Sequence, residues 1–442
     1  MPRAVYQFPR GFLWGTATAA HQVEGRNTNN NWYAWEQQEG RIRNGDRSGL
    51  ACDWWGGRWK EDLDRAVETG QNAHRLSIEW SRIQPTPDHW DEDALDHYRE
   101  ILQGMTDRGL TPMVTLHHFT DPLWLMELGG WENPDVVGLF DRFVARSVDA
   151  LQAYANLWVT INEPNVYYHA GYVAGGFPPG KHNLQSAVLV AQHMIRAHAA
   201  AYHTIHKIQP TARVGFALHY RRFLARRTWS PLDRAVRWMA DAFMNRMFLD
   251  TLLTGRMNVF GRFTRIPEAR NTQDFIGLNY YTTSLTAFDL RAAGNAFLRE
   301  SYPREALLSE TGFLANVPEG FFHALNWLRK IGKPIIVTEN GVEDPSDRMR
   351  PQYLVEHIHQ LWRAVNAAWQ IKGYFHWSLV DNFEWERGWS QRFGLWGLDP
   401  ATQKRFRRTS VDLYAAICHE NALSWDTVHQ YAPQVLSRLF PE

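Results

Sequence analysis

The chain has 442 residues, and its 47 lysines and arginines balance its 47 aspartates and glutamates, which gives a formal charge of zero at pH 7. This balance provides no general attraction to nucleic acid or to anionic membranes, so we expect neither as a partner. Two cysteines are too few for a disulfide framework, and the N-terminus has no apolar signal core, so the sequence predicts a cytoplasmic protein.

The chain contains no Pro-, Ser- or Gly-rich linker, no low-complexity tract and no apolar stretch long enough to cross a bilayer. Its length would suggest several domains, but α/β barrels are an exception to that rule. We therefore expect one domain over residues 1–442. A basic cluster at Arg221, Arg222, Arg226 and Arg227 is interpreted as a solvated loop.

Strand-like runs alternate with helix-like segments along the whole chain. Strands are expected at Phe12–Thr18, Ala73–Glu79, Pro112–His118, Leu157–Glu163, Arg213–Leu218, Asp274–Tyr280, Pro334–Glu339 and Lys372–Ser378. Helical periodicity is found at Ala94–Arg108, Asp135–Ala155, Ser186–Ile208, Leu232–Thr254, Gly320–Ile331 and Gln352–Trp369. Eight strands with intervening helices predict an α/β fold, a single (β/α)8 TIM barrel, with its active site among the carboxyl ends of the strands.

The first three strands each bring a polar side chain toward this end of the barrel. Gln22 lies just past the first strand, where its amide can bind a sugar diol or only loop backbone. Arg75, within the second, needs a carboxylate partner if it points inward, and is otherwise an ordinary arginine at the rim. His117 and His118 end the third, but adjacent strand residues face opposite sides, so we expect no metal and interpret neutral His118 as a hydroxyl partner.

Two glutamates end apolar strands in the same way. Asn162-Glu163-Pro164 ends the fourth strand, and Pro164 favours an extended backbone at Glu163. The second glutamate, Glu339, ends the strand that begins at Pro334. Each alone could be a strand-end salt bridge, but two carboxylates facing each other across a barrel mouth are typical of glycoside hydrolysis. If the enzyme is retaining, we expect the two carboxyl groups about 5–5.5 Å apart.

The last strand brings an aromatic surface and a further carboxylate to the same rim. Trp377 ends this strand, and Glu384 and Trp385 follow it closely. A carboxylate accepts hydrogen bonds from neighbouring sugar hydroxyls, while a ring packs against the apolar face of a sugar. Most of the 21 tryptophans are expected to fill the core, with a minority contacting ligand.

These motifs together resemble glycoside hydrolase family 1, the β-glucosidase family. The resemblance runs from Phe8 to about Arg408. It rests on the two glutamate motifs in this order and at this wide spacing, on the Phe12–Gly25 opening and on the Trp377–Trp385 segment. It implies a (β/α)8 barrel that hydrolyses β-glycosides with retention and without a cofactor.

By this resemblance, Glu163 is the general acid/base and Glu339 the nucleophile. The residues that look like the glycone-binding set are Gln22, His118, Asn162, Trp377, Glu384 and Trp385. Arg75, Asn279 and Tyr281 are similar to the groups that orient and charge-tune Glu339. The Arg75 cation and the Tyr281 hydroxyl are expected to lower the pKa of Glu339.

The resemblance also implies a substrate class. Members acting on 6-phosphosugars replace the matching glutamate by serine, whereas Glu384 is present here. Unphosphorylated β-D-glucosides are therefore expected, including aryl and alkyl glucosides, cellobiose and short cello-oligosaccharides, together with β-galactosides and β-fucosides. The alternatives are a transglycosylase, a member preferring galactose or fucose, and a non-catalytic sugar-binding barrel, which should have lost one glutamate. The small-molecule glycoside and the glucose product are the expected partners; a monomer and a homo-oligomer both stay open.

Overall fold

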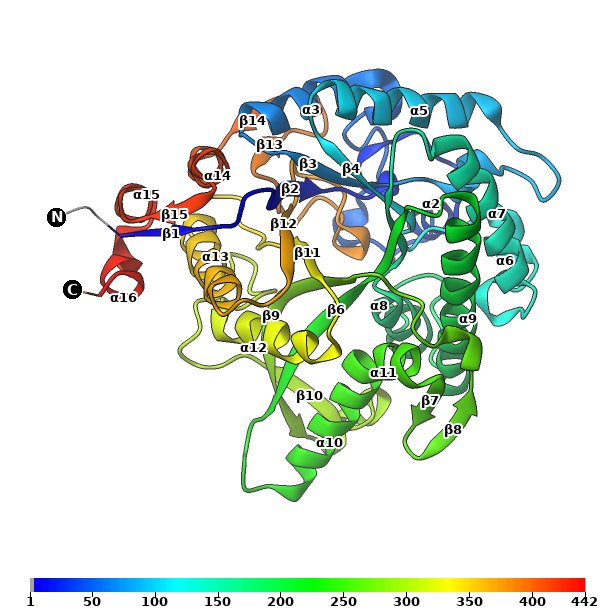
Figure 1. The fold of residues 1–442 in the computed structure, drawn as a ribbon. Coiled ribbons are helices and arrows are strands. Elements are labelled where there is room, and N and C mark those ends of the chain that lie inside the picture. Colours follow the sequence, from blue (N-terminus) through cyan, green and yellow to red (C-terminus); the bar gives the residue numbers. More distant parts are fainter. Residues whose placement is uncertain (1–3, 442) are drawn as a thin grey trace.

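Eight parallel strands close into a barrel at the centre of the computed structural model, which describes residues 4–441 (Figure 1). The barrel strands are β2 (Leu13–Ala17), β3 (Ala73–Ser77), β4 (Thr111–His117), β5 (Leu157–Asn162), β6 (Arg213–Ala225), β9 (Ile276–Phe288), β11 (Ile335–Asn340) and β12 (Ile371–Trp377). They follow the order β9-β11-β12-β2-β3-β4-β5-β6, and pairing between β6 and β9 closes the ring. The predicted (β/α)8 barrel and all eight predicted strands are confirmed.

The barrel strands are nearly continuous apolar runs because they are covered on both faces. Every residue of β5 and β11 is buried, with side chains alternating between the barrel interior and the surrounding helices. The apolar run of each such strand ends at the barrel mouth, where a polar side chain is no longer enclosed by the core. The carboxyl ends of β5 and β11 therefore carry Glu163 and Glu339 to the same face of the molecule.

Helices surround the barrel (Figure 1). The longer ones are α3 (Trp59–Glu68), α5 (Glu92–Asp107), α7 (Val136–Leu151), α9 (Leu184–Ile208), α10 (Pro231–Asp241), α11 (Met247–Thr254), α12 (Pro318–Leu328), α13 (Arg350–Asn366) and α14 (Thr409–Glu420). Their starts follow ordinary capping chemistry: Asp91 accepts a hydrogen bond from the Ala94 amide of α5 at 2.9 Å. The six predicted helices are present, but the one expected at 232–254 is divided into α10 and α11 by a π-helical turn, Ala242–Arg246.

Shorter elements decorate the barrel. The short helices are α1 (Ala20–Val23), α2 (Asn31–Glu36), α4 (Trp80–Ile83), α6 (Leu123–Glu127), α8 (Pro164–His169), α15 (Trp425–Tyr431) and α16 (Leu436–Leu439). The short strands are β1 (Val5–Gln7), β7 (Arg256–Val259), β8 (Arg262–Arg265), β10 (Leu298–Ser301), β13 (Trp396–Leu398), β14 (Arg405–Arg407) and β15 (Ala422–Ser424). β1 pairs with β15, so the two ends of the described chain lie side by side (Figure 1). Within residues 4–441, no helix combines the length and the apolar character that crossing a bilayer requires.

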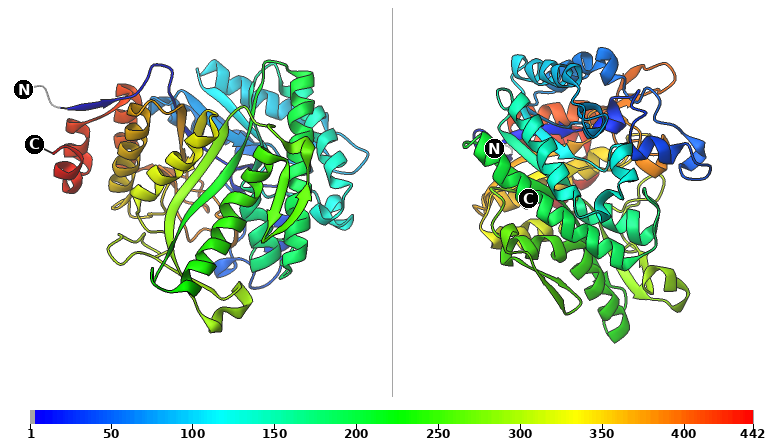
Figure 2. Two further views of the ribbon diagram at one scale, coloured as in Figure 1. Left: turned by 60° about the horizontal axis from the view of Figure 1, so that its bottom comes forward. Right: turned by 90° about the vertical axis from the view of Figure 1, so that its right-hand side faces the viewer.

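Two barrel strands are longer than predicted. β6 and β9 continue past the barrel as a paired ribbon, and β10 extends it on the far side of β9 (Figure 2). Arg221 and Arg222 therefore lie on β6, so the prediction that they belong to a solvated loop is wrong. The strand pattern is masked by these charges, and the residues of β9 that pair with β6 are 60 or 61 positions away in sequence, so a local pattern does not reveal the pairing.

Candidate active site

Glu339 is held by two short hydrogen bonds at the centre of the barrel mouth. Its Oε1 accepts from Arg75 Nη1 at 2.6 Å, and its Oε2 accepts from the Tyr281 hydroxyl at 2.6 Å. Arg75 is fully buried on β3 and also donates to the Thr338 carbonyl at 3.2 Å. The predicted pairing of Arg75 with a strand-end glutamate is therefore present, and both oxygens of this carboxylate have a donor that stabilises negative charge.

Burial has the largest influence on the pKa of Glu339. Desolvation raises this pKa, Arg75 lowers it and the neighbouring Glu163 raises it, with a net value of about 7 against an ordinary 4.5. Arg75 and Tyr281 both lower the pKa of Glu339, as predicted, but the effect of burial is larger. The free-energy cost of removing the carboxylate from water is larger than the stabilisation that Arg75 and Tyr281 give to its negative charge.

Glu163 stands at the turn between β5 and α8. Its φ and ψ angles are 42° and 56°, in the left-handed region, and not extended as Pro164 suggested. The chain passes from strand to helix at this one residue, and the proline that follows excludes only the right-handed helical conformation. A non-glycine residue in this conformation carries about 1–2 kcal/mol of strain, which is characteristic of functional positions.

One carboxyl oxygen of Glu163 is within hydrogen-bond distance of two side-chain nitrogen atoms. Glu163 Oε1 lies 2.9 Å from Asn279 Nδ2 and 3.0 Å from His219 Nδ1. Asn279 was expected to orient Glu339, and its backbone does pair with Glu339 across β9 and β11. Its side chain, however, donates to Glu163 and accepts from the Thr338 hydroxyl at 2.6 Å, so that assignment is corrected.

A buried network joins the two glutamates. Arg75 Nη2 donates to Asn162 Oδ1 at 2.7 Å, and Asn279 Nδ2 donates to the same oxygen at 3.1 Å. Asn162 Nδ2 in turn donates to His118 Nε2 at 2.9 Å, which places the ring proton on Nδ1. Burial holds the pKa of His118 well below its ordinary value, so the ring is neutral. Its Nδ1 has no protein partner among the described residues and is left for a hydroxyl.

A second polar group stands opposite the network. Gln22 Nε2 donates to Glu384 Oε2 at 3.1 Å, and Gln22 Oε1 has no partner within residues 4–441. Burial raises the pKa of Glu384 to about 8, assisted by the neighbouring Glu386 and Glu339. Trp377 and Trp385 supply aromatic faces beside His118, with ring centroids 5.9 Å from that imidazole in both cases.

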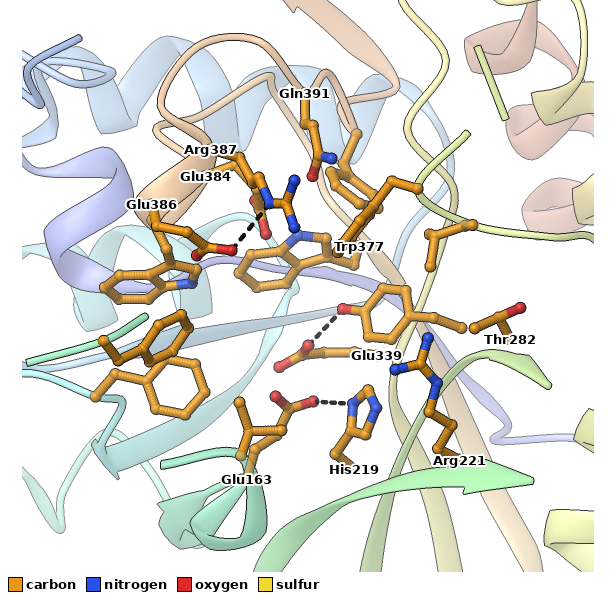
Figure 3. Close-up of a pocket in the computed structure, with 18 of the residues that line it drawn as sticks. Glu163, His219, Arg221, Thr282, Glu339, Trp377, Glu384, Glu386, Arg387 and Gln391 are labelled. Carbon is orange, nitrogen blue, oxygen red and sulfur yellow. Dashed lines mark hydrogen bonds and ion pairs between the residues drawn. The ribbon is translucent and has the colours of Figure 1, made fainter. Parts of the chain in front are cut away.

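These side chains surround a cavity of about 160 Å³ (Figure 3). Seven of the predicted site residues line it: His118, Glu163, Tyr281, Glu339, Trp377, Glu384 and Trp385. The other four, Gln22, Arg75, Asn162 and Asn279, lie behind them and are linked to them by the hydrogen bonds described above. Glu163 and Glu339 face each other across the cavity, and His219 and Arg221 lie on the Glu163 side (Figure 3).

Sequence reasoning missed His219. The residue directly follows the predicted strand Arg213–Leu218, so its place at a carboxyl strand end was a usable signal. His117, the neighbour of His118, is turned away from the site and contacts Asp121 at 3.0 Å. The two adjacent imidazoles thus have different partners, as alternation along a strand requires.

The sequence profile described as glycosyl hydrolase family 1 matches residues 4–423. The chain belongs to glycosyl hydrolase family 1. It is a retaining O-glycoside hydrolase for small β-glycosides.

Other members of family 1 are similar over nearly their whole length. β-Glucosidase A of Thermotoga maritima is 32% identical, over 95% of this chain and 99% of that protein. A β-galactosidase of Sulfolobus acidocaldarius is 30% identical, over 96% and 97%. Among solved structures, a β-glycosidase from Pyrococcus horikoshii superposes with a TM-score of 0.90 at 33% identity, covering 97% of this chain and 98% of that one.

Proposed function

We propose that this family 1 enzyme hydrolyses unphosphorylated β-D-glucosides, with Glu339 as nucleophile and Glu163 as general acid and base. The observation that carries the assignment is the different bonding of the two carboxyl groups. Both oxygens of Glu339 accept hydrogen bonds, one of them from a buried guanidinium, whereas Glu163 has both nitrogen contacts on one oxygen. These contacts favour negative charge on Glu339 and leave the other oxygen of Glu163 to carry a transferable proton.

In the first step, a Glu339 oxygen attacks the anomeric carbon while the bond to the aglycone oxygen breaks. Glu163 transfers its proton to that oxygen, so a neutral alcohol leaves and a covalent glycosyl-enzyme forms. Asn279 and His219 surround Glu163 Oε1, which leaves Oε2 to carry the transferred proton. The network thus selects which oxygen acts as the acid.

In the second step, the Glu339 carboxylate is an ester and no longer charged. Glu163 is now ionised and accepts a proton from water as that water attacks the anomeric carbon. The sugar leaves with its original anomeric configuration, Glu339 regains its charge and Glu163 its proton. Arg75 and Tyr281 stabilise the carboxylate as it departs, because both already lie 2.6 Å from its oxygens.

The opposite wall supports recognition of an unmodified sugar. His118 Nδ1 and Gln22 Oε1 are a buried donor and acceptor without partners in the described part of the chain, and sugar hydroxyls would satisfy both. Glu384 is half-buried near Glu386, and this pair of carboxyl groups disfavours a phosphate dianion on the sugar. The relatives of this chain include β-glucosidases and β-galactosidases, which supports activity on both sugars.

The test is a panel of nitrophenyl β-D-glucoside, β-D-galactoside, β-D-fucoside and 6-phospho-β-D-glucoside, compared by kcat/KM. The glucoside is expected to exceed its 6-phospho form in kcat/KM, since the glycone wall carries the carboxyl groups of Glu384 and Glu386. Protein with Glu339→Ala, purified from the same host, measures contaminating glycosidase. A higher kcat/KM for the phosphorylated substrate contradicts the proposal.

A further inference from the structure

A second cavity, of about 440 Å³, adjoins the catalytic one. The two share the wall residues Val166, Phe177, His219, Arg221, Phe313, Glu386 and Arg387. His219, Arg221, Glu386 and Arg387, which line both cavities, are labelled in the close-up of the catalytic one (Figure 3). The second cavity is therefore continuous with the catalytic one.

The second cavity lies on the side from which the leaving group departs. Its wall includes Val166, three residues after Glu163 on α8, and His219, which contacts Glu163 directly. Glu339, Glu384 and Trp377 line the catalytic cavity but not this one. Because Glu163 delivers its proton to the aglycone oxygen in the proposed mechanism, an aglycone attached to that oxygen points into the second cavity.

The walls of this cavity are mainly apolar. Helix α10 and the π-helical turn after it contribute Val236, Met239, Ala240, Phe243 and Met244, and Phe223 and Leu298 come from β6 and β10. A wall of this composition favours burial of hydrocarbon over burial of hydroxyl groups.

Several polar groups in the wall of this cavity are paired with other protein groups, although Arg221 Nε has no hydrogen-bond partner within residues 4–441. Arg221 pairs with Glu300 at 3.3 Å, and Arg387 pairs with Glu386 at 2.9 Å. Asn295 Nδ2 donates to the Leu298 carbonyl at 2.9 Å. A second sugar ring, which carries several hydroxyls, would have to break such bonds or leave most of its hydroxyls unpaired, and either costs free energy.

The apolar surface continues outward from the second cavity. Leu184 and Phe260 line it and also line a further hollow of about 490 Å³, together with Val188 and Val259. Leu184 is 46% exposed and Phe260 39% exposed, so the path reaches solvent. Trp238 packs beside Phe260 with ring centroids 6.0 Å apart. This shape suits a long occupant more than a compact one.

We infer that the enzyme takes β-glycosides whose aglycone is an extended apolar chain, in preference to those whose aglycone is a second sugar. The inference rests on the proposed function, because it places the aglycone beside Glu163. It assigns α10 and the β6–β10 ribbon the role of an aglycone wall. Among the expected substrates, alkyl glucosides are then favoured over cellobiose.

The experiment compares kcat/KM for methyl, butyl and octyl β-D-glucosides, below their micelle concentrations, and for cellobiose. The three alcohols are similar leaving groups, so chain length reports burial and not bond polarity. Full burial of one methylene corresponds to about fourfold, and we expect at least about a tenfold rise from butyl to octyl. A flat series, or cellobiose exceeding octyl glucoside, overturns the inference.

Substitutions in α10 test whether the second cavity causes the dependence of kcat/KM on chain length. Met239→Glu places a charge in the wall and should reduce the octyl-to-methyl ratio at least about tenfold, whereas Met239→Leu should retain it. Leu232→Glu is the matched control, because it adds the same charge to an exposed position of α10 outside the cavity. Ala240→Trp narrows the cavity without adding charge and serves if Met239→Glu does not fold. Equal ratios in Ala240→Trp and Leu232→Glu overturn the inference.

The outcome for the proposed glucose specificity can be distinguished from the outcome for the aglycone wall. If the nitrophenyl panel shows that another β-glycosyl group is turned over, the alkyl series is run with that group. A chain-length dependence in that series supports the aglycone wall even though the glucose preference is wrong.

Discussion

The side chain of His219 contacts the carboxyl group of Glu163, with Nδ1 3.0 Å from Oε1. Its ring also stacks on Tyr281, which donates to Glu339, with centroids 6.0 Å apart and planes inclined by 21°. The His219 imidazole therefore contacts Glu163 directly and also contacts Tyr281, the residue that donates a hydrogen bond to Glu339. This arrangement gives His219 a positioning role that can be tested without removing either carboxylate.

His219→Ala should lower kcat/KM by about 10- to 100-fold for alkyl glucosides, because a hydrogen bond to a charged or ionising group contributes about 1.5–3 kcal/mol. Activated dinitrophenyl glucoside should lose less, since its departure needs little proton transfer. His219→Asn keeps a short side chain with a hydrogen-bonding group and is the matched control. An equal loss with both leaving groups would mean that His219 supports only the fold.

Tyr281→Phe should move the acidic limb of kcat/KM to higher pH. The nucleophile must be ionised, so activity rises as pH increases through the pKa of Glu339, which is about 7. The Tyr281 hydroxyl lowers this pKa, and its removal should raise it by about one unit. The pH profile with an aryl glucoside measures the shift; a limb that stays in place or moves to lower pH contradicts the assignment.

Glu339→Ala should lower turnover at least about 10⁴-fold, because it removes the group that forms the covalent intermediate. Added azide should restore part of the activity and yield an α-glycosyl azide, since the small anion fits the space left by the carboxylate. Product stereochemistry by NMR decides the result. Near-native activity in a contaminant-free preparation would show that another residue is the nucleophile.

Glu384→Gln should stabilise the protein at pH 8 and lose that advantage near pH 4. Burial raises the folded-state pKa of Glu384 to about 8, so the folded protein holds a proton that the unfolded chain releases above about 4.5. This contribution to stability is fully present below the unfolded pKa and is lost as pH rises through the folded pKa. Urea unfolding at both pH values should show a difference on the order of a few kcal/mol, together with loss of glucoside binding.

The positions of several candidate site residues could be predicted because these residues lie within or just after buried strands in the sequence. Gln22, Arg75, Glu163 and Glu339 are polar residues within or just after apolar runs, and a parallel barrel gathers such positions at one end. The same rule places His219 at a carboxyl strand end, but the arginines that follow it do not fit the pattern of a buried strand.

Side-chain partners could not be predicted in this way. Asn279 lies beside Glu339 in the sheet, but its amide nitrogen donates to Glu163 while its amide oxygen accepts from the Thr338 hydroxyl. The pKa of Glu339 depends on how completely the barrel removes it from water, which no motif reports. The backbone of Glu163 follows from the immediate start of α8, and local rules about proline exclude only one alternative.

The role of Glu163 can be separated from that of its supports by the leaving group. Glu163→Ala removes the acid that protonates the departing oxygen, and this matters only when the leaving group is poor. General acid catalysis contributes about 10²–10⁴-fold, so cellobiose and alkyl glucosides should lose that much in the glycosylation step, while dinitrophenyl glucoside should lose far less. Removal of the base should also slow the attack of water, so the glycosyl-enzyme should accumulate with the activated substrate and be visible by mass spectrometry. Azide, which needs no base, should then give a β-glycosyl azide, in contrast to the α-azide from Glu339→Ala. If the variant loses activity equally on all leaving groups, or if no intermediate accumulates, the acid and base is another residue.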